Sequence, residues 1–150
     1  MTLLAALVLL ADTLRLAPGI HQGPLLLERP TVVIGEPGAV LRGTGKGTVL
    51  EVRGGAAGSI VRGLRIERSG RDPDQYDAGV LVAADSVQLE NLVIRDVLFG
   101  VYVNRARTVT LRGLDIAGPP GLRESERGDG ITFYSTRNVL AQGNRIFFVK

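Results

Sequence analysis

The sequence contains no cysteine and no tryptophan, and it has one methionine and one histidine among 150 residues. Without cysteine the chain has no disulfide framework, no thiolate nucleophile and no cysteine-based metal site. Copper(I) is bound by soft ligands, for which the sequence offers only Met1 and His21. His21 follows a Pro-Gly turn, where a partly exposed ring is more typical of a lone histidine than a metal ligand. No cofactor and no metal site are therefore predicted in this chain.

Charge of one sign is not concentrated anywhere in the chain. Lys and Arg total 18 and Asp and Glu total 15, which gives a net charge of +3. The two signs are interspersed, and the few aromatic residues do not alternate with basic runs. A nucleic-acid-binding groove needs a basic stretch of that kind, so nucleic acid is not expected as a partner.

The longest apolar run covers residues 3–11 and is too short to cross a bilayer as a helix. No membrane span is therefore predicted. The length of the run and its final alanine fit the core of an export signal, but no basic residue precedes it. The alternative is an apolar cap over the first coil of a repeat protein. Residues 1–11 are accordingly expected to be a signal peptide or an N-terminal cap.

Glycine and aliphatic residues are abundant, and they recur in a repeating pattern. Three units, over residues 78–94, 99–116 and 129–146, open on a glycine and continue with two alternating apolar stretches separated by a turn. Short strands of this kind bury their apolar side chains only by stacking on neighbouring units. The sequence therefore predicts an all-β domain over residues 12–150, a single-stranded right-handed parallel β-helix with coils of about 22 residues. Further strands, less regular at the N-terminal end, are expected at residues 13–16, 25–27, 32–34, 40–41, 48–52 and 61–66.

Aligning the units predicts the register in which the coils stack. An inward column of isoleucines and an outward column of mostly charged residues run through successive coils. A slip of one residue would expose the first column and bury the second, so the two columns support the same register. The inward column comprises Ile66, Ile94, Ile116 and Ile146, and the outward column comprises Arg62, Glu90, Arg112 and Gln142.

The spacing of the isoleucine markers reveals two insertions, at residues 70–79 and 118–130, which both precede the glycine that opens a unit. Both loops are therefore expected to leave the same corner of the solenoid, with a tight turn of the middle coil between them. Their polar residues are interpreted either as a docking or cation-binding surface or as the ordinary composition of exposed loops. The candidate binding residues are Asp72, Asp74, Tyr76, Asp77, Glu124, Glu126, Arg127 and Asp129.

Three segments resemble a known family: DAGVLV at 77–82, LFGVYV at 98–103 and ERGDGITFYSTRNVLAQGNRI at 126–146. They are similar to the NosD family of periplasmic right-handed β-helix proteins, which assist maturation of the copper enzyme nitrous oxide reductase. The resemblance extends to the N-terminal coil at residues 12–43. It implies an extracytoplasmic protein that works with an ABC transporter, a copper chaperone or nitrous oxide reductase itself.

The sequence departs from the family in two respects. Family members have many more coils, whereas this chain stops after NRIFFVK without a recognisable cap. It is therefore expected to be a fragment or to associate end to end through its last coil. The scarcity of soft ligands is the second departure, so no copper site is assigned.

The favoured function is a non-catalytic periplasmic scaffold of the NosD type. The alternative is a carbohydrate-binding or polysaccharide-processing β-helix, a hydrolase, lyase or epimerase. A hydrolase would use two carboxylates, for which Asp77 and Asp129 are candidates. A lyase would use a basic residue near a cation-held uronate, for which Arg127 beside Asp72 and Asp74 is the candidate. Sugar clefts usually contain aromatic platforms, and only Tyr102 and Tyr134 are expected to point outward. A purely structural domain without any site is the third interpretation.

Overall fold

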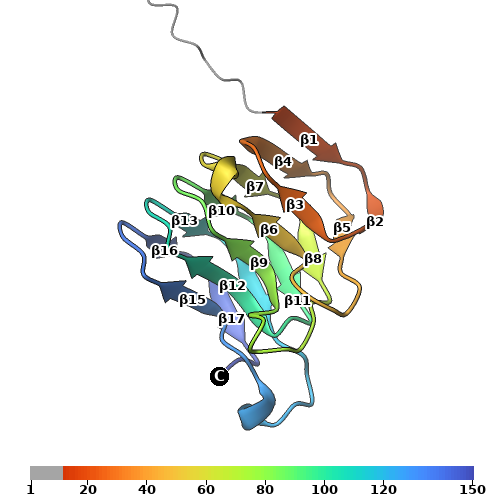
Figure 1. Cartoon of the computed structure of the whole chain (residues 1–150). Coiled ribbons are helices and arrows are strands. Elements are labelled where there is room, and N and C mark those ends of the chain that lie inside the picture. The colour runs from red at the N-terminus through yellow and green to blue at the C-terminus, as the bar shows by residue number, and fades with distance from the viewer. Residues whose placement is uncertain (1–11) are drawn as a thin grey trace, which may run out of the picture.

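A computed structural model describes residues 12–150, so the N-terminal run at residues 3–11 lies outside the described part of the chain. In this part of the chain seventeen strands form three parallel sheets, which confirms the predicted parallel β-helix. The strands stack along one axis, with β1 at one end of the solenoid and the C-terminus at the other (Figure 1). No helix within residues 12–150 is long and apolar enough to cross a membrane.

Within residues 12–150, each of the first five coils contributes one strand to each sheet, and the last coil contributes strands to sheets A and B only. Sheet A contains, in spatial order, β1 (Asp12–Leu16), β4 (Thr31–Gly35), β7 (Ile60–Arg62), β10 (Gln88–Glu90), β13 (Thr110–Arg112) and β16 (Leu140–Gln142). Sheet B contains β2 (Gly19–Gln22), β5 (Ala39–Arg42), β8 (Arg65–Glu67), β11 (Val93–Arg95), β14 (Asp115–Ala117) and β17 (Arg145–Phe147). Sheet C contains β3 (Leu25–Leu27), β6 (Leu50–Val52), β9 (Ala78–Val82), β12 (Phe99–Asn104) and β15 (Ile131–Tyr134).

The predicted register is confirmed in both columns. Ile66 pairs with Ile94, Ile94 with Ile116, and Ile116 with Ile146. In sheet A the outward positions align in the predicted order, Arg62, Glu90, Arg112 and Gln142. The inward column begins one coil earlier than the sequence indicated, because Leu41 of β5 pairs with Ile66 and is buried like it.

The interior of the solenoid is a continuous apolar core. Val101 and Val103 of β12 are fully buried, and so are Val80 and Val82 of β9. Gly100 permits a close approach at this level, because a β-carbon there would lie 2.3 Å from the Gly130 carbonyl oxygen. Burial of this kind is the main favourable contribution to the stability of the fold.

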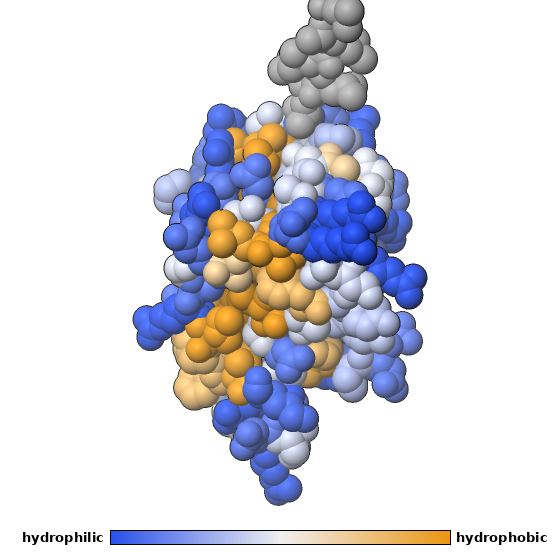
Figure 2. All heavy atoms as spheres, turned by 90° about the vertical axis from the view of Figure 1, so that its left-hand side faces the viewer, coloured by the Kyte–Doolittle hydropathy of each residue, from blue (hydrophilic) through white to orange (hydrophobic). Residues whose placement is uncertain are grey.

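The last coil within residues 12–150 exposes side chains at positions that are buried in earlier coils. Phe133 and Ile146, which pair with the buried Val103 and Ile116, are 37% and 40% exposed. Leu140, which pairs with the outward Thr110, is 46% exposed. Phe148, which follows β17, is 48% exposed. Figure 2 views the molecule from the side where the last coil lies in Figure 1 and shows an apolar area between hydrophilic flanks. End-to-end association through this coil stays a prediction.

Candidate functional site

Both predicted insertions leave the corner at which the chain passes from sheet B to sheet C. The first loop, residues 68–77, joins β8 to β9, and the second, residues 118–130, joins β14 to β15. Between them, residues 96–98 join β11 to β12 in a tight turn. A third loop at this corner, residues 43–49 between β5 and β6, was not predicted. Its glycine-rich sequence, just before a strand, is the signal that could have revealed it.

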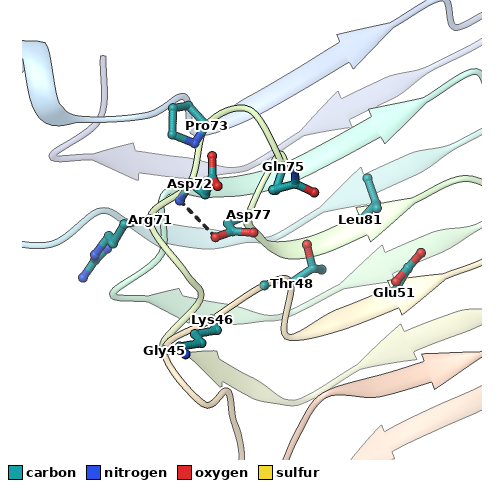
Figure 3. A pocket seen from close by; sticks show the side chains of 11 residues that line it. Gly45, Lys46, Thr48, Glu51, Arg71, Asp72, Pro73, Gln75, Asp77 and Leu81 are labelled. Carbon is teal, nitrogen blue, oxygen red and sulfur yellow. Dashed lines mark hydrogen bonds between the residues drawn. The ribbon is translucent and has the colours of Figure 1, made fainter.

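The first loop is organised by two of its own aspartates. The Asp72 amide donates a hydrogen bond to the Asp77 carboxylate (3.0 Å, dashed in Figure 3), and the Asp74 amide donates to the Asp72 carboxylate (2.9 Å). Asp77 is only 4% exposed. Its carboxylate therefore holds the loop together, whereas the sequence analysis had placed it on the binding surface. A buried carboxylate that accepts a backbone hydrogen bond is a typical loop-stabilising arrangement.

Two contacts fasten this loop to the next coil. Arg71 forms an ion pair with Asp96 in the tight turn. The ring of Tyr76 packs on that of Tyr102 in β12, with centroids 4.8 Å apart, and Phe99 meets Tyr102 edge to face at 5.8 Å. Aromatic pairs at these separations are attractive beyond the area that they bury. The first loop is thus anchored through its base and through Tyr76.

The second loop contains a short 3-10 helix, η2 (Glu124–Glu126), and its candidate residues form contacts within the loop. The Arg123 amide donates to the Glu126 carboxylate at 3.0 Å. Arg127 donates two guanidinium hydrogen bonds to the Leu122 carbonyl, at 3.2 and 3.0 Å. Asp129 accepts a hydrogen bond from the Thr132 hydroxyl at 3.1 Å. Glu124 is exposed in η2.

A notch of about 460 Å³ lies between the two inserted loops. Leu98 and Phe99 of the tight turn provide an apolar part of its lining. Arg71 and Pro73 line it from the first loop. From the second loop and the chain end it is lined by Glu126, Arg127, Asp129 and Lys150, together with Ser125 and Gly128. We call this the inter-loop notch.

Only part of the predicted residue set meets in the inter-loop notch. Glu126, Arg127 and Asp129 line it, whereas Asp72 and Asp77 line a separate, more open groove of about 790 Å³ (Figure 3). That groove lies between the first loop and loop 43–49, and Lys46, Thr48 and Glu51 also line it. The surface residues that the sequence analysis missed are therefore the apolar pair of the tight turn and the polar residues of loop 43–49.

The two tyrosines predicted to point outward differ in exposure. Tyr134 is 50% exposed, but Tyr102 is only 7% exposed because Tyr76 and Phe99 pack against it. Burial raises the pKa of Tyr102 above its usual value of 10.0, and the nearby Tyr76, Tyr134 and Asp129 raise it further. Tyr102 and Tyr134, together with Tyr76 and Phe99, make four aromatic side chains on β12, β15 and the first loop.

The catalytic arrangements considered from the sequence find little support in this geometry. Asp77 is occupied within its loop, and the guanidinium of Arg127 is bonded to the Leu122 carbonyl. Within residues 12–150, no three His, Asp or Glu side chains are grouped as metal ligands. His21 lies on β2, and its Nε2 donates a hydrogen bond to the Ala17 carbonyl at 2.7 Å, which fixes the tautomer because a carbonyl oxygen only accepts.

Comparisons with known proteins agree with this architecture. No protein-family profile matches the chain. Over 134 residues it is 32% identical to the probable ABC transporter binding protein NosD of Stutzerimonas stutzeri, covering 88% of this chain and 30% of that protein. The protein of the same name from Pseudomonas aeruginosa is 33% identical over 135 residues, covering 87% of this chain and 31% of that protein. The chain thus spans about a third of the length of these relatives.

A solved structure also matches, the catalytic domain of a GH87 α-1,3-glucanase in complex with nigerose. The TM-score is 0.59 at 14% sequence identity, and the match covers 90% of this chain and 26% of that one. At such low identity the likeness concerns the fold alone. The parallel sheets and the identity with two NosD proteins over most of the chain agree, and this chain is a NosD-like parallel β-helix protein.

Proposed function

We propose that this chain is a non-catalytic accessory protein of the NosD type that docks a protein partner in the inter-loop notch. The observation that carries the proposal is the notch itself, which the two inserted loops form around an apolar turn. The first of these loops is anchored to the next coil. Leu98 and Phe99 provide a small apolar centre, and Arg71, Glu126 and Arg127 provide charged groups around it. Protein interfaces commonly combine an apolar centre with a polar rim.

The names of the relatives suggest the class of partner. Both are described as probable ABC transporter binding proteins, so a transporter subunit is the first partner to test. The family resemblance adds a copper chaperone and nitrous oxide reductase as further candidates, and it supports a proposed role in the periplasm during maturation of that enzyme. In this proposal the chain supplies a shaped surface and leaves metal handling to its partners, because Met1 and His21 are the only copper(I) ligands that its sequence offers.

Loop replacement tests the proposal. We expect that replacing residues 118–128 by the tight turn of residues 96–98 weakens binding of the partner, as measured by calorimetric titration. The same replacement of residues 68–77 should weaken it as well. Trimming both loops should reduce the binding free energy little more than trimming one does, because the effects of residues that share a partner are not additive.

Controls separate docking from folding in this experiment. Thermal melting should show that each trimmed protein remains folded, since the core columns are unchanged. Lys46→Ala alters a loop at the same corner that does not line the inter-loop notch, so it should leave binding unchanged. Undiminished binding by a folded protein that lacks both loops would place the docking surface elsewhere.

A second function, carbohydrate binding, is favoured by the aromatic cluster. Tyr76 on the first loop and Tyr134 on β15 are both 50% exposed, and Tyr76 packs on Tyr102. Exposed aromatic rings are suitable platforms for sugar rings. Titration with α-1,3-linked glucose oligosaccharides would test this function, with Tyr134→Ala expected to weaken binding. The absence of saturable binding at millimolar sugar would exclude this class of ligand.

A further inference from the structure

A second functional feature lies at the corner where the chain passes from sheet C to sheet A. Residues 105–109 join β12 to β13, and residues 135–139 join β15 to β16. These turns stack directly, since the Arg105 amide donates to the Tyr134 carbonyl (2.8 Å) and the Thr108 amide donates to the Arg137 carbonyl (2.9 Å). Both turns lie at the left-hand edge of the solenoid in Figure 1.

Three arginines project from these two turns. Arg107 and Arg137 form a parallel β-bridge, so they are adjacent positions of one column, and Arg105 precedes them on the upper turn. All three residues are exposed. None of the ion pairs found within residues 12–150 includes them. Asp85, the carboxylate of the preceding coil's turn, accepts a hydrogen bond from the Arg107 backbone amide at 2.9 Å.

This column differs from the charged column of sheet A. There Glu90 separates Arg62 from Arg112, so unlike charges are adjacent. At the sheet C to sheet A corner, Arg107 and Arg137 are neighbours with no carboxylate between them. Like charges one strand spacing apart repel each other, and an anion between them removes that repulsion.

Every residue that lines the space between the turns has a side chain that can donate hydrogen bonds. The space has a volume of about 460 Å³, and its lining consists of Arg105, Arg107, Ser135, Thr136 and Arg137. Each guanidinium offers a planar fork of N–H donors, and each hydroxyl offers one more. Such forks match the oxygens of phosphate and sulfate groups. A dianion with at least three acceptor oxygens uses these donors more fully than a carboxylate does.

We infer that these stacked turns bind a dianionic tetrahedral oxyanion, a phosphate or sulfate group carried on a small ligand. The three guanidinium groups neutralise the dianion, and Ser135 and Thr136 donate to its remaining oxygens. The volume exceeds what a bare ion needs and lies within the range of small-molecule pockets. The site lies at a different corner from the inter-loop notch and rests on a separate set of residues.

Calorimetric titration of the whole chain tests the inference, with phosphate, sulfate and acetate compared at one fixed ionic strength. The expected result is saturable binding of phosphate or sulfate, and weaker binding of acetate. Glucose 6-phosphate and glucose 6-sulfate then distinguish the two sources of the oxyanion. The double substitution R107S/R137S should reduce affinity about tenfold or more, because hydrogen bonds to charged groups are lost.

The control removes the same charge from another face. Arg62 and Arg112 are exposed and take part in no ion pair found within residues 12–150, so R62S/R112S should change affinity less than about twofold. Equal losses in the two double variants would overturn the inference, as would the lack of saturable binding in the unmodified chain. If R107S/R137S fails to fold, R107K/R137K supplies the test. It keeps the charge but removes the forks, and undiminished affinity of this variant would also overturn the inference.

Discussion

The ring of Tyr76 packs against the ring of Tyr102 with centroids 4.8 Å apart and planes inclined by 40°. Tyr76 belongs to the first inserted loop, and Tyr102 belongs to β12 in the coil that has no insertion. Tyr76 reaches this position from a left-handed backbone conformation, with φ of 55°. The contact therefore joins the first loop, whose Arg71 and Pro73 line the inter-loop notch, to the neighbouring coil.

We expect Tyr76→Ala to lower the pKa of Tyr102. Burial is the largest cause of the raised pKa, and Tyr76 itself also raises it, so removing the ring weakens both effects. In a spectrophotometric titration of phenolate absorbance, the step at highest pH should move to lower pH. Tyr102→Phe should abolish that step and so identify it. An unchanged step in Tyr76→Ala would show that the ring does not cover Tyr102 in solution.

Val101→Asp should unfold the protein. Val101 is fully buried between Val80 and Ile131, and an unpaired carboxylate there would lose its hydration without gaining a partner. Val93→Asp is the matched control, because Val93 lies on β11 with its side chain only partly buried. Circular dichroism should show lost structure for the first variant and native structure for the second. Native spectra for both would contradict the register.

The stability of the fold should decrease in acid because of Glu67. Burial alone would raise the pKa of this carboxyl, but hydrogen bonds and charges from Arg42 and Arg65 outweigh it and leave the pKa below its usual value of 4.5. A carboxylate with a lowered folded-state pKa stabilises the fold above its unfolded-state pKa. That contribution is lost as the pH falls through the folded-state pKa.

Glu67→Gln should therefore cost on the order of 1 kcal/mol near neutral pH and less in acid. Urea denaturation at several pH values measures this difference. Glu28→Gln serves as the control, because Glu28 pairs with Arg53 at a site where its side chain is 68% exposed. A pH-independent effect of Glu67→Gln would show that its ion pairs do not carry the acid sensitivity.

The purified chain should not bind copper(I) tightly. Met1 and His21 are its only soft side chains, and His21 is engaged with the Ala17 carbonyl. A competition titration against a copper(I) chelator measures this directly. A stoichiometric complex of submicromolar affinity would contradict the prediction and would also change the proposed division of labour with the partner.

The coil architecture could be predicted because only one register of stacking keeps the apolar residues inside and the charged residues outside. After a slip of one residue Ile94 would be exposed and Glu90 would be buried, and the sequence alone shows that this would be unfavourable. The strands of the N-terminal coils were predicted less completely. β2 was not predicted, because Ile20, His21 and Gln22 do not show the apolar alternation of later units. The repeat template therefore failed where the inward positions are less regular.

The candidate site was predicted less completely than the fold. The position of the two insertions follows from counting residues between markers, so the inter-loop notch could be expected. The direction of each loop side chain depends instead on local hydrogen bonds, such as the one from the Asp72 amide to Asp77. Periodicity does not encode such bonds, and the burial of Asp77 was missed for that reason.

The corner between sheets B and C also determines how freely this protein can be altered. The chain returns to the same register after a turn of three residues and after a loop of thirteen, as Val101 and its partners Val80 and Ile131 show. Loop length at this corner is therefore independent of strand pairing. Foreign recognition segments could be grafted there. Binding specificity could be changed by replacing whole loops while the solenoid remains a constant scaffold.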